Sequence, residues 1–147
     1  MKQNIDKISE LMIDVICEFY ENDSKARTFG TDTELYHSEI HMLQCIMDNP
    51  GLHISGIART LGITRGAASQ TAKRLERKQM IEKKVNPIDS KKILMLLTTK
   101  GKTACLNHKL AHEKHRTVIS KILSSSSAEQ LLFLKSFLLK FETALKE

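Results

Sequence analysis

The segment HISGIARTL (residues 53–61), followed by GITRGAASQTAKRLERK (residues 62–78), decides the fold of this chain. Both parts have helix-forming composition, and Gly62 separates them with a residue that tolerates the positive φ of a tight turn. Thr64 is a favourable N-cap for the second helix. Ala58 supplies the small residue that two steeply crossing helices need where they touch. The pattern predicts a helix-turn-helix.

The second helix of this pair has two different faces. At about 100° per residue, Ala68, Ala72 and Leu75 fall within one narrow arc, which is enough to attach the helix to its own domain. The opposite side is basic and polar, and such a face can enter the major groove and reach base edges and phosphates. A solvated surface helix is the alternative. The residues predicted to contact DNA from this helix are Arg65, Gly66, Ser69, Gln70, Lys73, Arg74 and Arg77.

A β-hairpin is predicted next, in IEKKVNPIDSKKILMLLT (residues 81–98), where two apolar and β-branched runs flank the turn residues. Lysines on a narrow hairpin can enter or straddle the minor groove of DNA. We therefore predict wing contacts from Lys84, Lys91 and Lys92. A basic hairpin that only keeps an edge strand from aggregating is the alternative.

The charge of the chain is concentrated in this central part. The net charge is +6 over 147 residues, but residues 1–50 carry −6, residues 51–100 carry +8 and residues 101–147 carry +4. A strongly basic segment beside an acidic one is the electrostatic signature of a nucleic-acid partner. The length fits one domain or one intertwined unit.

Amphipathic helices are predicted on both sides of the basic module, at residues 5–20, 36–47 and 98–123, and after Ser127, which forms a capping-box pattern with Gln130. The apolar stripe of the last helix is wider than a domain of this size needs. We expect the first and last helices to form a dimer interface, although packing on their own domain is the alternative.

The order of these elements, the block ISGIARTLGITRGAASQTAKRLERKQMIEKK and the run DSKKILMLLTTKG together resemble the MarR family of winged helix-turn-helix transcription regulators over nearly the whole chain. The resemblance implies a mainly α fold with a β-hairpin wing, in a single unit over residues 1–147. Residues 1–34 and 99–147 would be dimerisation helices, and residues 35–98 the DNA-binding domain. It also implies an intertwined homodimer, a pseudo-palindromic operator and a small ligand that releases or tightens DNA.

Two positions depart from the family pattern. The wing reads DSK where the family commonly has D-R-R or D-x-R, so Lys91 stands in place of an arginine. Lysine lacks the planar guanidinium fork, which predicts weaker reading of the minor groove. Gln79 stands where a glycine is usual before the wing, and this leaves the form of that turn open.

Histidines form a second pattern, in CLNHKLAHEKH and on the helix predicted at residues 36–47. His108 and His112 are four residues apart, and two imidazoles at this spacing plus one from another helix form a common zinc site. Resemblance to zinc-responsive MarR-family members implies that His41, His108 and His112 are the ligands. Glu21 and Asp23 are the nearest candidates for a fourth. Surface histidines with no ligand role, and the polar lining of an organic-ligand pocket, are the alternatives.

No enzyme is indicated by the sequence. HEKH lacks the H-E-x-x-H spacing of a zinc hydrolase, and neither a convincing nucleophile–base pair nor a phosphate-binding glycine loop is present. Zinc or another transition metal would therefore be an effector and not a required cofactor. The three cysteines are far apart, which predicts reduced thiols, with Cys17 as the candidate redox sensor.

The sequence as a whole predicts a cytoplasmic protein with no membrane partner, because it has neither a signal-peptide pattern nor an apolar run of about 18 residues. The predicted function is sequence-specific, double-stranded-DNA-binding transcription regulation, by a repressor that responds to a ligand or metal. The alternative is a metal-binding helical interaction protein without specific DNA binding.

Overall fold

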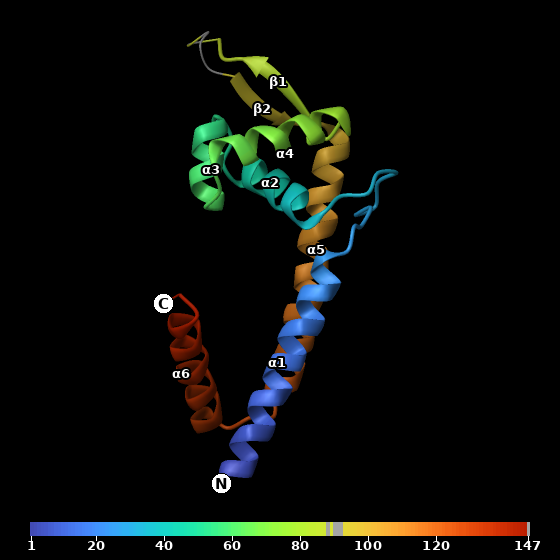
Figure 1. Ribbon diagram of the computed structural model, residues 1–147. Helices are drawn as coiled ribbons and strands as arrows, with labels where there is room; N and C mark the ends of the chain where they lie inside the picture. The colour runs from blue at the N-terminus through green and yellow to red at the C-terminus, as the bar shows by residue number, and fades with distance from the viewer. Residues whose placement is uncertain (88, 90–92, 147) are drawn as a thin grey trace. The chain divides into compact units, whose positions relative to one another are not determined.

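A computed structural model describes residues 1–87, 89 and 93–146 (Figure 1). The chain divides into two compact units, Met1–His108 and Lys109–Glu147. A two-stranded antiparallel sheet and long helices confirm the predicted mainly α fold with a hairpin. The elements in chain order are α1 (Lys2–Ser24), α2 (His37–Asp48), α3 (Ile54–Leu61), α4 (Arg65–Arg77), β1 (Ile81–Val85), β2 (Ile93–Leu97), α5 (Thr99–Leu123) and α6 (Ala128–Ala144).

The turn between α3 and α4 forms as its residues predict. Gly62 has φ 65°, which is the left-handed conformation, and ends α3. The Ile63 N–H donates to the Ala58 carbonyl at 3.0 Å. Thr64 caps α4, because its Oγ1 accepts a hydrogen bond from the Ala67 N–H at 3.1 Å. Local chemistry alone therefore sets the start and direction of α4.

The hydrophobic core lies within the winged helix-turn-helix, where α2, α3 and α4 pack together beneath the hairpin (Figure 1). Helix α4 buries Ala68, Ala72 and Leu75, the narrow arc predicted from its sequence. All buried hydrophobic side chains of the described residues lie between Leu35 and Cys105. This module therefore has its own core.

The hairpin is held to the end of α4 and the start of α5 by backbone contacts. Gln79 has φ 58°, the left-handed conformation that usually selects glycine. The Met80 N–H donates to the Leu75 carbonyl at 2.9 Å, and the Thr98 N–H donates to the Met80 carbonyl at 3.0 Å. A Cβ on Gly101 would lie 2.1 Å from that same Met80 oxygen. The fold therefore requires glycine at position 101.

A buried carboxylate connects α2 to α4. Glu39 is 1% exposed, and its Oε2 accepts hydrogen bonds from the Tyr36 N–H at 3.0 Å and from the Lys78 ammonium at 2.7 Å. Arg74 Nε lies 3.6 Å from the other oxygen, Oε1. Lys78 also donates to the Glu34 carbonyl at 2.8 Å. A buried charge needs such compensation, so Glu39 fixes the start of α2 against the end of α4.

The terminal helices have a different character. Helix α1 runs from Lys2 to Ser24, whereas the prediction was residues 5–20. The prediction followed apolar periodicity, and the additional residues at both ends of the helix are polar. Helix α6 has the predicted capping box, in which the Ser127 N–H donates to Gln130 Oε1 at 2.8 Å. Neither helix contains a buried residue. Across the described part of the chain, we find no helix with the length and apolar content that crossing a bilayer requires.

Candidate nucleic-acid interface and metal-ligand cluster

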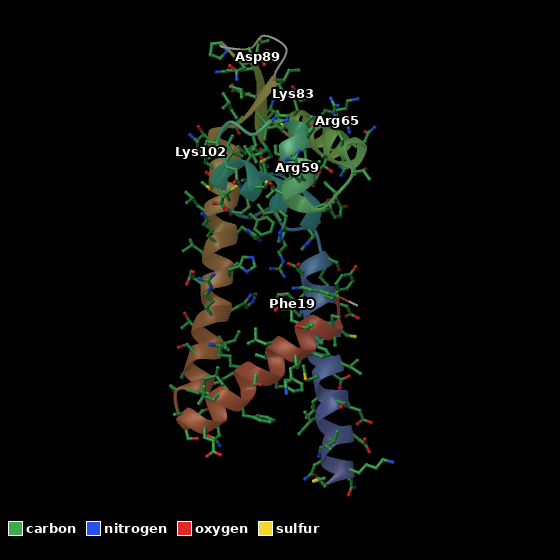
Figure 2. All side chains as sticks on the ribbon, turned by 90° about the vertical axis from the view of Figure 1, so that its left-hand side faces the viewer. Phe19, Arg59, Arg65, Lys83, Asp89 and Lys102 are labelled. Atoms are coloured by element: carbon green, nitrogen blue, oxygen red, sulfur yellow. The ribbon has the colours of Figure 1, made fainter. Side chains whose placement is uncertain are left out.

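The polar face of α4 is open to solvent over its whole length. Arg65, Gln70, Lys73 and Arg77 are exposed, and Ser69 is partly buried. Figure 2 shows Arg65 on α4 and Lys83 on the hairpin at the same end of the module. The structure thus presents together, from one rigid helix, most of the side chains predicted to contact DNA.

Gly66 lies in the first turn of α4 and is exposed. The nearest atom to a Cβ built there would be Thr64 Oγ1, at 3.9 Å. The protein itself therefore has room for a side chain at position 66. Glycine inside a helix lowers stability relative to alanine, and packing within the folded chain does not require glycine at position 66.

Arg74 differs from the other predicted contacts. Its Nη2 donates to the Thr71 hydroxyl at 2.9 Å, and its Nε lies near the buried Glu39 carboxylate. Arg74 is therefore engaged in holding α4 to α2, at the edge of the exposed face.

Apart from Asp89 in the turn, the described charges of the wing lie on its first strand, β1. Lys84 is exposed and lies 3.6 Å from Glu82 of the same strand. Lys83, which was not among the predicted contacts, pairs with Glu76 of α4 at 2.6 Å. Lys91 and Lys92 lie outside the described residues, so their predicted contacts stay predictions.

A cluster of metal-ligand side chains lies between the end of α1 and the start of α2. Asp23, His37 and His41 each offer a donor atom, and these atoms lie within 4.8 Å of one another. His37 Nδ1 is 2.5 Å from Asp23 Oδ2. The His37 and His41 rings lie 4.1 Å apart between centroids, as expected for residues four apart on a helix. Two imidazoles and a carboxylate fit zinc, which commonly takes three protein ligands and keeps a fourth position open.

Two of the three histidines of the predicted triad, His41 and His108, lie together in the first compact unit. The His108 ring makes an edge contact with the His41 ring, with centroids 5.3 Å apart, and it also lies 5.5 Å from Phe29. His108 is 6% exposed. His112 lies one turn further along α5, in the second compact unit, and its predicted role as a ligand stays a prediction. Of the two carboxylates considered as further ligands, the cluster contains Asp23.

His37 was not predicted from the sequence as a ligand. Its signal was present, because His37 and His41 have the same four-residue spacing that was noted for His108 and His112.

The loop between α1 and α2 is anchored to α5 beside the cluster. Lys100 Nζ lies 2.5 Å from Asp32 Oδ1 and 2.6 Å from the Thr33 hydroxyl. The hydrogen bond from Lys100, together with its charge, lowers the pKa of the Asp32 carboxyl. Asn107 Nδ2 donates to the Phe29 carbonyl at 3.0 Å. These contacts set the path of the loop that joins Asp23 to His37.

No disulfide joins the cysteines of the described residues. Cys45 is buried, and burial together with the nearby Asp48 charge raises the pKa of its thiol. Such a thiol is a weak nucleophile. Cys17 is exposed on α1, and its redox role stays a prediction.

Comparisons with known proteins agree with this architecture. Residues 35–93 match the model of the MarR family. An uncharacterized HTH-type transcriptional regulator of Bacillus subtilis (strain 168), YhjH, is 25% identical over 104 residues, which are 71% of this chain and 59% of that protein. The chain therefore matches less than two thirds of the length of this relative.

Two solved structures have the same fold. One is a zinc-responsive MarR family member, ZitR of Lactococcus lactis, with a TM-score of 0.78 at 20% identity over 96% of this chain and 99% of that chain. The other is FabT of Streptococcus pneumoniae in complex with DNA, with a TM-score of 0.68 at 24% identity over 99% of this chain and 98% of that chain. At these identities, the similarity establishes the winged helix-turn-helix fold.

Proposed function

The chain belongs to the MarR family of winged helix-turn-helix transcriptional regulators, a family of non-enzymatic proteins, and from that premise we propose that it is a homodimeric repressor. It would bind a pseudo-palindromic operator in double-stranded DNA, in the cytoplasm, and respond to a metal or small-molecule effector. The observation that carries this proposal is the exposed polar face of α4, which starts at the capped residue Thr64 and rests on a narrow buried arc.

DNA contact follows from the chemistry of that face. Arginine and glutamine can read base edges in the major groove, and serine and lysine can bind base edges or phosphates. The proposed contacts are Arg65, Gly66, Ser69, Gln70, Lys73, Arg74 and Arg77 on α4, with Lys84, Lys91 and Lys92 on the wing. Arg74 would contact DNA mainly from the edge of this face, because its guanidinium already donates a hydrogen bond to the Thr71 hydroxyl.

Dimerisation is proposed through the terminal helices, in residues 1–34 and 99–147. On one face of α1 the exposed fractions of Ile8, Val15 and Phe19 are 57%, 65% and 54%. At the end of α6 those of Leu138 and Leu145, seven residues apart, are 49% and 70%. Contiguous apolar faces of this kind usually mark an interaction surface. A second copy of the chain is the proposed occupant, since two-fold symmetry matches a pseudo-palindromic operator.

The metal response is proposed from the cluster of Asp23, His37 and His41. The short contact between Asp23 Oδ2 and His37 Nδ1 allows two arrangements. Asp23 would either bind the metal itself or orient His37, whose other ring nitrogen would then be the ligand. In both, zinc would supply a fixed link between the end of α1 and α2. One of the structural relatives, ZitR, is a zinc-responsive protein, and this supports zinc as the first metal to test.

The DNA-binding proposal is tested by selecting duplexes from random sequence with the full chain, and then measuring affinity against salt concentration. Phosphate neutralisation releases counterions, so binding should weaken steeply as salt rises. Arg65→Gln and Gln70→Ala should each relax base preference by about 1–3 kcal/mol at one position of each half-site. Failure to select any sequence, or binding that is insensitive to salt, would contradict the proposal.

The metal proposal is tested by elemental analysis and zinc titration of single variants. His37→Ala should abolish zinc binding if the observed cluster is the site, whereas His112→Ala should abolish it if the sequence-predicted triad is the site. His115→Ala, an exposed histidine on α5, is the matched control. Retention of full zinc content in both the His37 and the His112 variant would exclude both sites.

A further inference from the structure

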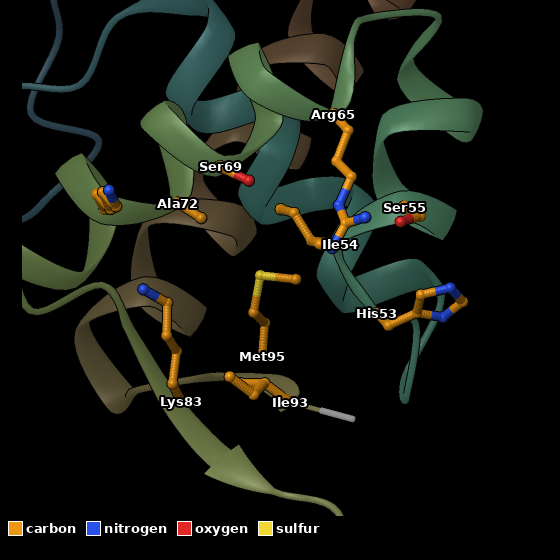
Figure 3. Close-up of a pocket in the computed structure, with 10 residues that line it drawn as sticks. His53, Ile54, Ser55, Arg65, Ser69, Ala72, Lys83, Ile93 and Met95 are labelled. Carbon is orange, nitrogen blue, oxygen red and sulfur yellow. The ribbon is translucent and has the colours of Figure 1, made fainter. Parts of the chain in front are cut away.

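The cations on the polar face of α4 differ in whether an acidic side chain lies beside them. Arg65 and Lys73 line an open cavity of about 290 Å³ between α3, α4 and the hairpin, to which β2 contributes Met95. None of the described residues that line this cavity is acidic. Figure 3 shows Arg65 extending from α4 toward Ile54 of α3. These two cations therefore face the open side of α4 with no carboxylate in the described lining of the cavity.

Arg74, in contrast, is held from two sides. Its Nη2 donates a hydrogen bond to the hydroxyl of Thr71, a residue that is 5% exposed, at 2.9 Å. Its Nε lies 3.6 Å from Oε1 of Glu39, a residue of α2 that is 1% exposed. The Arg74 side chain itself is 43% exposed. An accessible guanidinium is thus held over a buried carboxylate.

Glu39 balances two cations and holds them unequally. Its Oε2 accepts hydrogen bonds from the Lys78 ammonium at 2.7 Å and from the Tyr36 N–H at 3.0 Å. Lys78 also donates to the Glu34 carbonyl at 2.8 Å and lies over the Tyr36 ring, 5.4 Å from its centroid. Oε1 accepts no hydrogen bond from the described residues, and Arg74 is the cation beside it. Lys78 is therefore fixed by several contacts, whereas charge is what holds Arg74 to Glu39.

The burial of Glu39 decides between its attraction for Arg74 and that of a DNA phosphate. At an effective dielectric constant of about 20, two charges attract about fourfold more strongly than at the same distance in water. A buried carboxylate oxygen without a hydrogen bond is also costly, and a neighbouring cation reduces this cost. A DNA phosphate is hydrated and screened by counterions. We therefore expect Arg74 to stay with Glu39 when DNA binds.

We propose that Glu39 is a positioning residue that keeps Arg74 away from DNA phosphates, so that α4 binds DNA with one cation fewer than its sequence offers. Gln70 and Arg77, which are exposed, lie four and three residues from Arg74. Residues at these spacings are neighbours on a helix surface, so a released Arg74 would reach the DNA backbone. Phosphate contacts add affinity without sequence information. Glu39 therefore weakens binding to every duplex alike and leaves sequence preference to other side chains of α4.

The inference rests on the proposed DNA binding, and its first test compares two cations of α4. Affinity of the full chain is measured against salt for the selected duplex and for an unrelated duplex of equal length. Lys73→Gln should lower the slope of log affinity against log salt concentration by about 0.9, the contribution of one phosphate contact. Arg74→Gln should lower it by less than about 0.3. A loss of about 0.9 for Arg74→Gln overturns the proposal, and thermal unfolding checks that both variants are folded.

The second test releases Arg74. Glu39→Gln keeps the shape of the side chain and removes its charge, so it should raise the slope by about 0.9 and strengthen binding to both duplexes by about threefold or more at about 0.1 M salt. Glu34→Gln, the same charge change at an exposed position of the preceding loop, is the matched control and should raise the slope by less than about 0.3.

The same substitution in a second background assigns the effect to Arg74. In an Arg74→Gln protein, Glu39→Gln should raise the slope by less than about 0.3. An equal gain with and without Arg74 would mean that Lys78 or the overall charge is responsible, and overturns the proposal. A gain confined to the selected duplex overturns it as well, because a phosphate contact has no sequence preference.

A measurement without DNA completes the test. The Nε–H proton of Arg74, followed by nitrogen-15 NMR, should exchange with water about fivefold or more faster in Glu39→Gln than in the unaltered chain, while that of Arg65 should not change. Equal exchange of the Arg74 proton in the two proteins overturns the proposal. A chain that binds no duplex contradicts the proposed function, and this inference with it. Salt-dependent binding whose slope is unchanged in Glu39→Gln overturns this inference alone.

Discussion

The winged helix-turn-helix and the terminal helices differ in where their apolar side chains lie. The segment from Leu35 to Cys105 encloses all buried hydrophobic side chains of the described chain, while α1 and α6 bury none. The first region is stabilised by its own packing. The second has exposed apolar side chains, so under the proposed dimerisation we expect its stability to depend on a second copy of the chain. The stability of the winged helix-turn-helix should not change with protein concentration, whereas the stability of the terminal helices should rise with it.

The largest effect is expected in the packed region, at Gly101. A methyl group there would meet the Met80 carbonyl oxygen at 2.1 Å, and backbone on both sides prevents relaxation. Gly101→Ala should lower the free energy of unfolding by about 3 kcal/mol, measured by urea denaturation. Lys102→Ala, at the exposed next position, is the control and should change it by less than about 0.5 kcal/mol. A loss below about 1 kcal/mol would show that the two backbones are further apart.

A smaller effect, with a different signature, is expected in the terminal helices. Leu138 of α6 is 49% exposed, so Leu138→Glu should be harmless in a monomer. At an interface it should weaken association by about 2–3 kcal/mol per buried charge, seen by sedimentation at several concentrations. Lys135→Glu on the same helix is the matched control. If Leu138→Glu leaves self-association intact, α6 is not part of the interface.

The smallest effect separates folding from function within α4. Gly66→Ala should raise the free energy of unfolding by about 0.5–1 kcal/mol, because alanine is favoured over glycine in a helix and has room here. The same change should weaken operator binding if DNA approaches the backbone at this turn. Gly62→Ala should instead destabilise by about 1 kcal/mol, because position 62 is left-handed. Unaltered DNA affinity in Gly66→Ala would remove Gly66 from the interface.

Local signals were sufficient to predict the winged helix-turn-helix. Gly62, Thr64 and the arc of Ala68, Ala72 and Leu75 act within a few residues of one another, so their sequence positions determine their geometry. The start of the wing was less determined. Gln79 takes a left-handed conformation beside Met80, whose carbonyl accepts a hydrogen bond from Thr98, eighteen residues further along the chain, and such a non-local bond has no local sequence signal.

The candidate metal cluster was only partly predictable, for a related reason. His37 and His41 share a helix face, which spacing reveals. Asp23 joins them only because α1 continues to Ser24 and the following loop is fixed to α5 through Lys100 and Asn107. Those contacts span more than sixty residues of sequence, and no local pattern encodes them. The cavity beside Met95 likewise depends on three elements meeting, and was not foreseen.

The left-handed Gln79 has a consequence for how the wing acts. A glycine at this joint would sample many backbone angles, whereas glutamine has a narrow set, and the bonds from Met80 and Thr98 restrict it further. The hairpin is thus aimed before any partner arrives. A restrained hairpin loses less conformational entropy on docking, so in the proposed DNA complex this stiffness would offset part of the affinity predicted to be lost with lysine in place of arginine.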